Sequence, residues 1–413
     1  MKTALRLSLL IAVLSSFTGY SQNYLGAHAS NYAGVMGTDL QPASFVDGRF
    51  KVDVNLASFN FNLYQNAVYF DTKDMPKWWI KSFRDSSIYN SWASPDSTFS
   101  DRYLIKRYSE SSKKTVGLYQ NTQIDLMNFA FHINPKIAVG FTARLRSVTN
   151  MDEIDPKLAV LAENGLEYSQ LWNQTFNEEL ATMNHLTWME YGLLYSQVLK
   201  DENQHFFKMG GKVKGLFGSA AGYLHTDNFS YNLKNEDTTF NMSGDFSYGH
   251  SDNLDPYLNG DFSKATKSAS KFGLGLDLGF VYEWRPDWKE YKYDMDGETN
   301  IWRRDLEKYK LRVGASILDL GRMKFTKGNN SRDFSVRSTN PFDLQVFDNT
   351  EDLNDFNNKI DSLTTNNPEW TANEGTGQTF HMNLPTSVSL QLDYHIWKWF
   401  YVNATGIISV QNR

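Results

Sequence analysis

The feature that most constrains the fold is a 13-residue segment, 272–284, in which every second residue is apolar. The apolar positions are Phe272, Leu274, Leu276, Leu278, Phe280, Tyr282 and Trp284. Because successive side chains of a β-strand point to opposite faces, one face is continuously apolar and the other is small or charged. Strands of soluble proteins usually hold about 5–6 residues, whereas a transmembrane strand needs about 9–11. The segment is therefore typical of a transmembrane β-strand; a half-buried strand of a soluble sandwich is the alternative.

The N-terminus has the features of a secretory signal peptide. Lys2 and Arg6 precede an apolar stretch over residues 7–14, and Gly19-Tyr20-Ser21 offers a cleavage site with small residues. This apolar stretch is too short for a spanning helix, so we assign residues 1–21 to a signal peptide. The chain has no cysteine. Lipid attachment at this cleavage site, disulfides and thiol–metal sites are excluded for that reason.

Composition narrows the class further. The mean hydropathy is −0.50, and no apolar stretch of about 18 residues follows the signal, which excludes a helical membrane protein. Aromatic residues make up 15% of the chain, which suits the two aromatic belts of an outer-membrane barrel. The net charge of −6 is spread along the chain. No basic stripe of the kind that nucleic-acid binding requires is present, so we expect no nucleic-acid partner.

Alternating segments and irregular segments predict the organisation of the chain. The clearest hairpin turns at Asn134-Pro135-Lys136, and a phase shift near Ala57-Ser58 predicts a bulge or turn between two strands. Residues 151–184 predict one helix or two short ones. Long loops are expected over residues 71–112, 251–270, 285–307 and 328–377. The predicted fold is all-β: a transmembrane antiparallel barrel of about 12–14 strands over residues 48–413, with long external loops, a small helical insertion and a plug-like N-terminal segment over residues 22–47.

Three short motifs carry a resemblance to a known group of proteins. They are Gln41-Pro42-Ala43-Ser44 before the first strand, the basic pair Arg144 and Arg146, and Leu384-Pro385-Thr386 leading into the strand Val388 to Tyr394. Their order resembles an uncharacterised Bacteroidota outer-membrane β-barrel family related to the long-chain fatty-acid transporters and the PorV/PorP-type barrels. Gln41 stands where that pattern has asparagine. The resemblance implies an outer-membrane location and no catalytic activity.

Charged residues on the polar faces of the predicted strands are the candidate site. The candidate lumen-lining residues are Arg144, Arg146, Lys208, Lys212, Lys214, Asp277 and Arg312. A charged side chain facing lipid at mid-bilayer costs about 2–4 kcal/mol, so we expect these residues to face inward. They form either an anion-attracting lumen or, as we favour, a lumen filled with salt bridges, since Asp53, Asp277 and Glu283 share that face.

No catalytic or cofactor site is expected. The segment Asp294 to Glu298 looks like part of a calcium loop, in which Asp305 or Glu307 would have to serve as the last ligand. An acidic external loop is the favoured interpretation. The histidines lack metal-binding spacing and no nucleophile elbow is present. We therefore expect a protein that is not an enzyme and has no cofactor or metal.

The leading functional hypothesis is an outer-membrane barrel that passes or binds a hydrophobic or small amphipathic solute. The alternative is a structural or assembly partner of an outer-membrane secretion or surface complex. The expected partners are outer-membrane lipid, a hydrophobic small molecule or another outer-membrane protein. The last residues, Ser409 to Arg413, lack the terminal aromatic of most outer-membrane barrels. We therefore expect Arg413 to be a truncation point that leaves the Phe50 and Phe400 strands without regular pairing.

Overall fold

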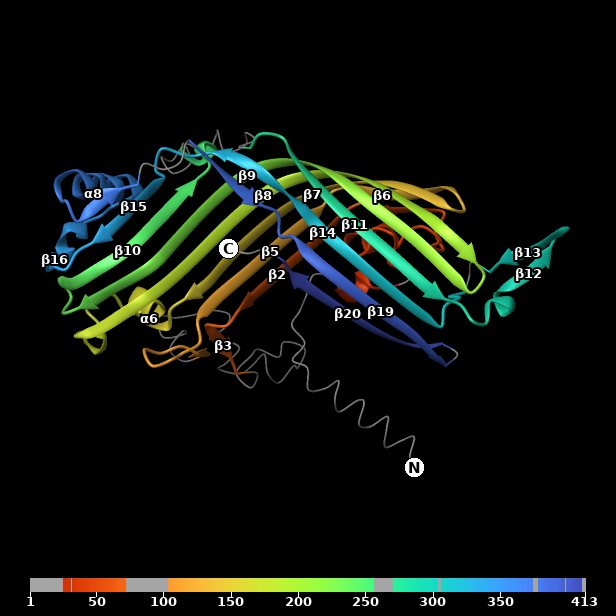
Figure 1. Ribbon diagram of the computed structural model, residues 1–413, viewed down its shortest axis with the longest axis horizontal. Helices are drawn as coiled ribbons and strands as arrows, with labels where there is room; N and C mark the ends of the chain where they lie inside the picture. Colours follow the sequence, from red (N-terminus) through yellow and green to blue (C-terminus); the bar gives the residue numbers. More distant parts are fainter. Residues whose placement is uncertain are drawn as a thin grey trace, which may run out of the picture.

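A large antiparallel β-sheet dominates the computed structural model, which describes residues 25–30, 32–71, 103–255, 270–303, 306–373, 378–397 and 399–410 (Figure 1). The continuous path runs in the order β1, β6, β7, β8, β9, β11, β14, β19, β20. Its strands are β1 (Val52–Asn55), β6 (Asn128–Asn134), β7 (Ile137–Ile154), β8 (Gln174–Glu202), β9 (His205–Leu233), β11 (Gly273–Trp284), β14 (Leu311–Thr326), β19 (Ser387–Trp397) and β20 (Phe400–Ser409).

The first strand of this path is followed, after a break, by a second strand in the same sheet. β2 (Ser58–Gln65) continues the direction of β1 and pairs with β5 (Val116–Asp125), which in turn pairs with β7. The break between β1 and β2 confirms the phase shift predicted near Ala57-Ser58. Register shifts also interrupt the long β8–β9 pairing, which lets strands of 29 residues bend.

The ends of the path do not pair with each other within the described part of the chain, since β1 pairs with β6 and β20 with β19. The path holds nine strands and the whole sheet sixteen, which differs from the expected 12–14. The difference arises because broken strands and short strands at one end do not each cross the whole sheet. Closure into a barrel stays a prediction.

The two ends of the sheet differ in their connections. At one end, β6 joins β7 through Pro135-Lys136, and β8 joins β9 through Asn203-Gln204; we call this the short-turn end. At the other, the long-loop end, β7 joins β8 through α6 (Pro156–Asn164) and η2 (Ser169–Leu171). Helix α6 confirms the predicted helical insertion, although β8 begins ten residues before the predicted end of that insertion.

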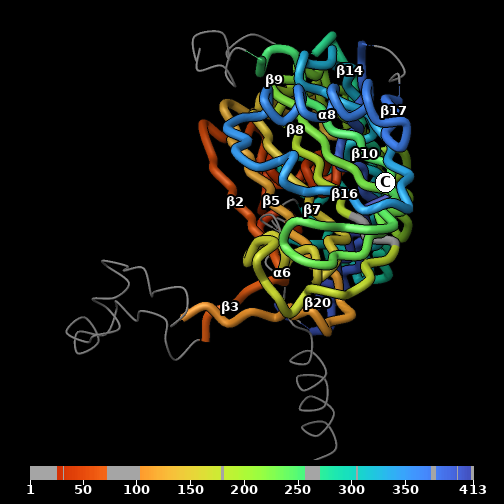
Figure 2. The backbone as a smooth tube through the Cα atoms, turned by 90° about the vertical axis from the view of Figure 1, so that its left-hand side faces the viewer, coloured from red at the N-terminus to blue at the C-terminus, as the bar shows by residue number. Residues whose placement is uncertain are grey.

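The long-loop end carries an extension with its own core. Here β10 (Thr238–His250) pairs with β9, β15 (Arg332–Arg337) and β16 (Phe342–Asp343), and β17 (Trp370–Ala372) pairs with β15. Helix α8 (Leu353–Asn366) lies beside these strands (Figures 1 and 2). Five of the eleven buried side chains of this core are aromatic, namely Phe176, Tyr231, Phe334, Phe342 and Trp370.

This extension corrects the prediction of an irregular stretch over residues 328–377. The apolar residues that hold it together are widely spaced, and α8 has only four apolar residues, Leu353, Phe356, Ile360 and Leu363, among polar ones. Isolated strands as short as β16 and β17 give no readable alternation. Pairing with β10, which the local sequence does not reveal, makes them strands.

The predicted loop over residues 285–307 is also partly wrong. Its middle forms a hairpin of β12 (Lys292–Met295) and β13 (Glu298–Trp302) at the short-turn end. Asp296 and Gly297 have φ angles of 53° and 84°, as the two central residues of a tight hairpin turn require. The acidic motif is therefore an Asp-Gly turn, and the described residues hold no cluster of metal-ligating side chains.

Small elements complete the described chain. β3 (Val68–Phe70) pairs with β4 (Leu104–Lys106), and β18 (Thr379–Asn383) pairs with the end of β14. Short helices α2 (Leu25–His28), η1 (Gly34–Asp39), η3 (Asp252–Leu254), η5 (Trp288–Tyr291) and η6 (Leu344–Phe347) lie in connections. No helix in the described part of the chain is long and apolar enough to cross a membrane. The predicted signal peptide, the predicted truncation point Arg413 and most of the loops predicted at 71–112 and 251–270 lie outside the described residues.

The two faces of the sheet have opposite chemistry. Along β11, Gly273, Asp277 and Glu283 are buried, whereas Leu274 is 62% exposed and Phe280 51% exposed. This alternation confirms the predicted strand. We call the face that carries Asp277 the inner face and the face that carries Leu274 the outer face.

Candidate functional site

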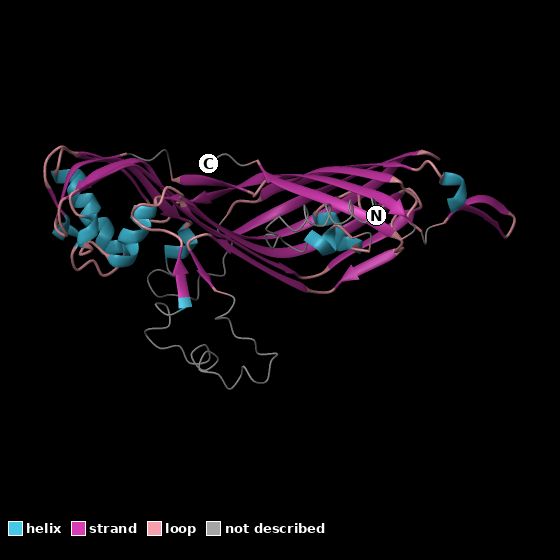
Figure 3. Ribbon diagram, turned by 90° about the horizontal axis from the view of Figure 1, so that it is seen from below, coloured by secondary structure: helices cyan, strands magenta, loops and turns pink. Residues whose placement is uncertain are grey.

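Residues 25–47, which we call the N-terminal segment, cover the inner face near the short-turn end. Figure 3 shows the short helices of this segment within the curve of the strands. Val35, Phe45 and Val46 are buried against side chains of β6, β7, β8 and β9, namely Ala130, Ala138, Leu194, Val198 and Phe206. A hydrogen bond of 2.7 Å from the backbone N–H of Val35 to Asp53 Oδ2 ties the segment to β1.

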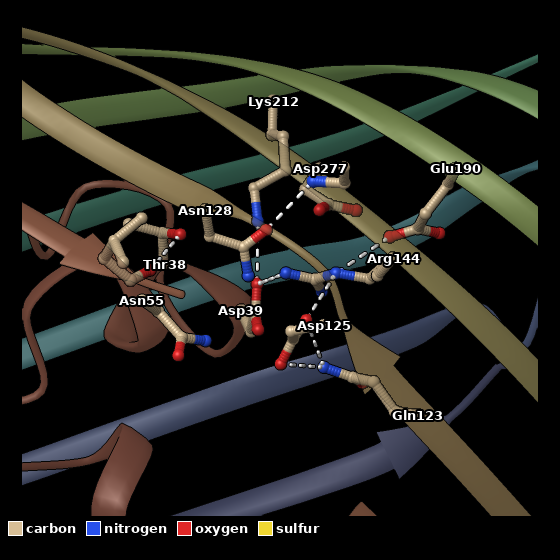
Figure 4. Close-up of polar contacts among 12 residues, drawn as sticks. Thr38, Asp39, Asn55, Gln123, Asp125, Asn128, Arg144, Glu190, Lys212 and Asp277 are labelled. Atoms are coloured by element: carbon tan, nitrogen blue, oxygen red, sulfur yellow. Dashed lines mark hydrogen bonds and ion pairs between the residues drawn. The ribbon is translucent and has the colours of Figure 1, made fainter. Parts of the chain in front are cut away.

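Asp39 joins this segment to the sheet by ion pairs (Figure 4). Its Oδ1 lies 2.7 Å from Arg144 Nη2 and 2.8 Å from Lys212 Nζ, and all three side chains are almost fully buried. Arg144 Nε also lies 3.2 Å from Asp125 Oδ1 and 3.5 Å from Glu190 Oε1. Burial opposes the charge of Asp39, but Arg144 and Lys212 outweigh burial and hold the pKa of Asp39 well below its usual range.

A second cluster is built around Asp319. The pairing of β11 with β14 shifts register between Leu276 and Leu278, and opposite this shift Asp319 has a φ of 56°. Such a bulge redirects a side chain, here onto the inner face. Both carboxylate oxygens lie 2.8 Å from Arg146 Nη1, and Oδ1 lies 2.5 Å from Lys214 Nζ.

The other contacts of this cluster complete the pairing of its charges. Lys214 Nζ lies 2.6 Å from Asp277 Oδ1, which also accepts the backbone N–H of Asp319 at 2.7 Å. The guanidinium of Arg146 lies 4.8 Å from the centre of the Trp188 ring. Each charge of the cluster therefore faces an opposite charge, as buried charges require.

A third cluster of charged residues lies at the short-turn end. Arg285 Nη2 lies 2.6 Å from Glu283 Oε2 and 3.0 Å from Asp47 Oδ2, so it joins β11 to the end of the N-terminal segment. Lys208 Nζ donates to the carbonyl of Val46 at 2.9 Å. Arg312 Nε lies 3.8 Å from Glu283 Oε1.

Glycines on two neighbouring strands make room for Gln41-Pro42. Gly210 on β9 pairs with Gly279 on β11. A Cβ atom on Gly279 would lie 1.8 Å from Gln41 Oε1, and one on Gly210 would lie 2.4 Å from the Pro42 backbone. Gln41 Nε2 donates to the carbonyls of Phe280 and Ala315, both at 3.2 Å. The backbone of the N-terminal segment can therefore lie directly on the sheet.

The structure brings the seven candidate residues together on the inner face, in three adjoining clusters. Five of the six basic residues lie within 4 Å of a carboxylate, and the sixth, Lys208, contacts the Val46 carbonyl. This pairing fits the favoured salt-bridge arrangement better than an anion-attracting one. Sequence reasoning missed Asp39, Asp47 and Asp319. Asp39 and Asp47 lie outside any strand and gave no signal. The apolar positions shift by one residue between Ile317 and Leu320, from odd to even numbers, and this shift could have revealed the bulge at Asp319.

A cavity opens on the inner face between the N-terminal segment and the long-loop end. Its volume is about 950 Å³. The Asp39 and Asp319 clusters form its floor, and its wall rises along β5, β7, β8 and β9. The size suits a small molecule, since ligand pockets span about 300–1,000 Å³.

Comparison with known proteins identifies the family and nothing more specific. A model of a family of unknown function, DUF5723, matches residues 42–413. The chain belongs to this family. No curated protein and no solved structure matches it.

Proposed function

We propose that this member of the DUF5723 family is an outer-membrane β-barrel protein that takes a small amphipathic solute into its interior. The main support for the proposal is that the sheet buries charged side chains and exposes apolar ones. Lys212 and Glu190 are completely buried, whereas Leu193 is 66% exposed. Burying a leucine side chain is worth about 1.5–3 kcal/mol, so water is a poor solvent for this outer face and lipid is a good one.

One apolar row illustrates the argument. Cross-strand pairing aligns Phe141, Leu193, Val213, Leu276 and Leu320 over β7, β8, β9, β11 and β14. Leu193, Val213 and Leu320 are each at least half exposed. Contiguous apolar surface of this kind marks a membrane or protein contact in a soluble chain and the lipid face in a barrel. The charged inner face supports the barrel, because lipid could not solvate it.

The N-terminal segment acts as a plug in this proposal, and the cavity beyond it receives the solute. The tight β6–β7 and β8–β9 turns at one end and the long connections at the other match the usual asymmetry of outer-membrane barrels, with the long loops outside the cell. The connection from β11 to β14, which carries the β12–β13 hairpin, is an exception at the short-turn end. The solute would enter from the long-loop end and meet the plug.

A liposome swelling assay tests the proposal. The intact chain in vesicles should admit small uncharged solutes slowly, and deletion of residues 25–47 should speed swelling severalfold while the folded, heat-modifiable form is retained. Failure of the intact chain to insert, or loss of the folded form on deletion, would contradict the proposal.

The alternative, a structural partner of an outer-membrane complex, is favoured by one observation. Three ion-pair clusters and the N-terminal segment occupy the inner face, which suits an occluded barrel. Stoichiometric co-purification of another outer-membrane protein, with no swelling after deletion of the segment, would favour this alternative.

A further inference from the structure

The cavity above the N-terminal segment has a tiered lining. Its floor holds the ion pairs of Asp39 and Asp319. Above the floor lies an apolar tier with Val148, Leu186, Leu318 and Met382. A polar tier follows towards the long-loop end. In such a lining the apolar tier can contact the hydrocarbon part of an amphipathic molecule, and the polar tier can contact its head group.

The polar tier is a single row across four strands. Tyr119 of β5 pairs with Asn150 of β7, Asn150 with Asn184 of β8, and Asn184 with Tyr223 of β9. All four residues line the cavity. The side chains of Tyr119, Asn150 and Asn184 are half-buried and make no hydrogen bond to any described residue. Two amides and a phenol thus present both donors and acceptors to the cavity.

The buried charges of the cavity are paired with one another. Asp39, Asp277 and Asp319 line it beside three cations, from Arg144, Arg146 and Lys214, and the further lining residue Asp152 is exposed. The three cations are already paired with carboxylates, and Lys212 adds only one more cation behind Asp39. A carboxylate solute would therefore find no free cation among these groups, and an ammonium solute would find buried carboxylates that are already paired.

We infer that the Tyr119–Asn150–Asn184–Tyr223 row binds the head group of an uncharged amphipathic solute that carries hydroxyl or amide groups. The apolar tier packs against a short hydrocarbon part of the same molecule. Neutral hydrogen-bonding groups discriminate in favour of a partner that satisfies them, because unsatisfied polar groups cost free energy once they lose water. The inference rests on the proposed function, in that it names the solute class of the same cavity.

Equilibrium dialysis against the chain in lipid nanodiscs tests this inference, with three probes that share a six-carbon tail. The probes are hexyl β-glucoside, hexanoate and hexylammonium, and empty nanodiscs correct for partition into lipid. We expect the glucoside to bind at least tenfold more tightly than either charged probe. Tighter binding of hexanoate or of hexylammonium would overturn the inference.

Variants test the row itself. The double substitution Asn150→Ala, Asn184→Ala should weaken binding of the glucoside about tenfold, which corresponds to about 1.4 kcal/mol. Asn177→Ala is the matched control, because Asn177 lies on the same strand and is exposed. Equal effects of the two changes would overturn the inference. Failure of the chain to enter nanodiscs would instead contradict the membrane proposal, so the two failures are distinguishable.

Discussion

At the scale of single residues, Asp39 connects the N-terminal segment to the sheet. It is the one acidic side chain of that segment that meets both Arg144 and Lys212, and the three are buried together. Removing one partner of a buried ion pair typically costs about 3–5 kcal/mol, because the remaining charges stay buried without compensation. Docking of the segment should therefore depend on this carboxylate.

The substitution Asp39→Asn tests that dependence. The chain has no native cysteine, so Val46→Cys provides a single thiol at a position that is completely buried. Asp39→Asn should increase the labelling rate of this thiol by a membrane-impermeant maleimide at least tenfold, since release of the segment exposes it. Asp348→Asn, at an exposed site, is the control. Unchanged labelling with Asp39→Asn would show that the ion pairs do not hold the segment.

Docking of the N-terminal segment on the sheet should also depend on pH. Burial lowers the pKa of His28. The nearby cations Arg144 and Lys212 also lower this pKa, whereas the carboxylates Asp39 and Asp125 raise it. The docked segment thus holds neutral His28, and the released segment takes up a proton more readily. Docking should weaken as the pH falls below about 6.5, the ordinary histidine value. Faster labelling of the thiol at pH 5 than at pH 7.5, abolished by His28→Gln, is the expected result; pH-independent labelling would contradict it.

At the scale of elements, alternation predicted the long strands well and the contacts between distant segments poorly. The 272–284 segment, the hairpin at Pro135 and the break near Ala57 follow from local pattern and all appear in the sheet. The α8 extension and the β12–β13 hairpin depend on partners far apart or on a turn set among charged residues. The basic residues of the site were predictable, because the two-residue alternation of a strand fixes which face of the sheet each side chain occupies. Asp39 was not predictable, because it lies in the N-terminal segment, which has no such alternation.

The close packing of the N-terminal segment on β11 should depend on Gly279. Gly279→Ala places a methyl group against Gln41 and should loosen the segment, raising the labelling of the thiol introduced by Val46→Cys severalfold. Gly406→Ala is the matched control, since a Cβ there meets no atom within 4 Å. If both substitutions leave labelling unchanged, the close approach of Gln41 does not contribute to docking.

At the scale of the whole molecule, the account depends on the outer face being a lipid face. The apolar row through Leu193 and Leu276 crosses five strands, and the charged clusters lie on the opposite face of the same strands. The two-sided chemistry was readable from residues 272–284 alone. The order of the strands, the lack of pairing between β1 and β20 in the described part, and the cavity were not readable, because they depend on how the strands associate.

The most direct test of this central claim is the substitution Leu193→Arg. In water an exposed leucine can be replaced by arginine at little cost, whereas at mid-bilayer the change costs about 2–4 kcal/mol. Val346→Arg, at an exposed position outside the sheet strands, is the control. The measurement is the fraction of chain that reaches the folded, heat-modifiable form in lipid vesicles. We predict a large loss for Leu193→Arg and none for Val346→Arg; equal assembly of the two variants would contradict the membrane barrel.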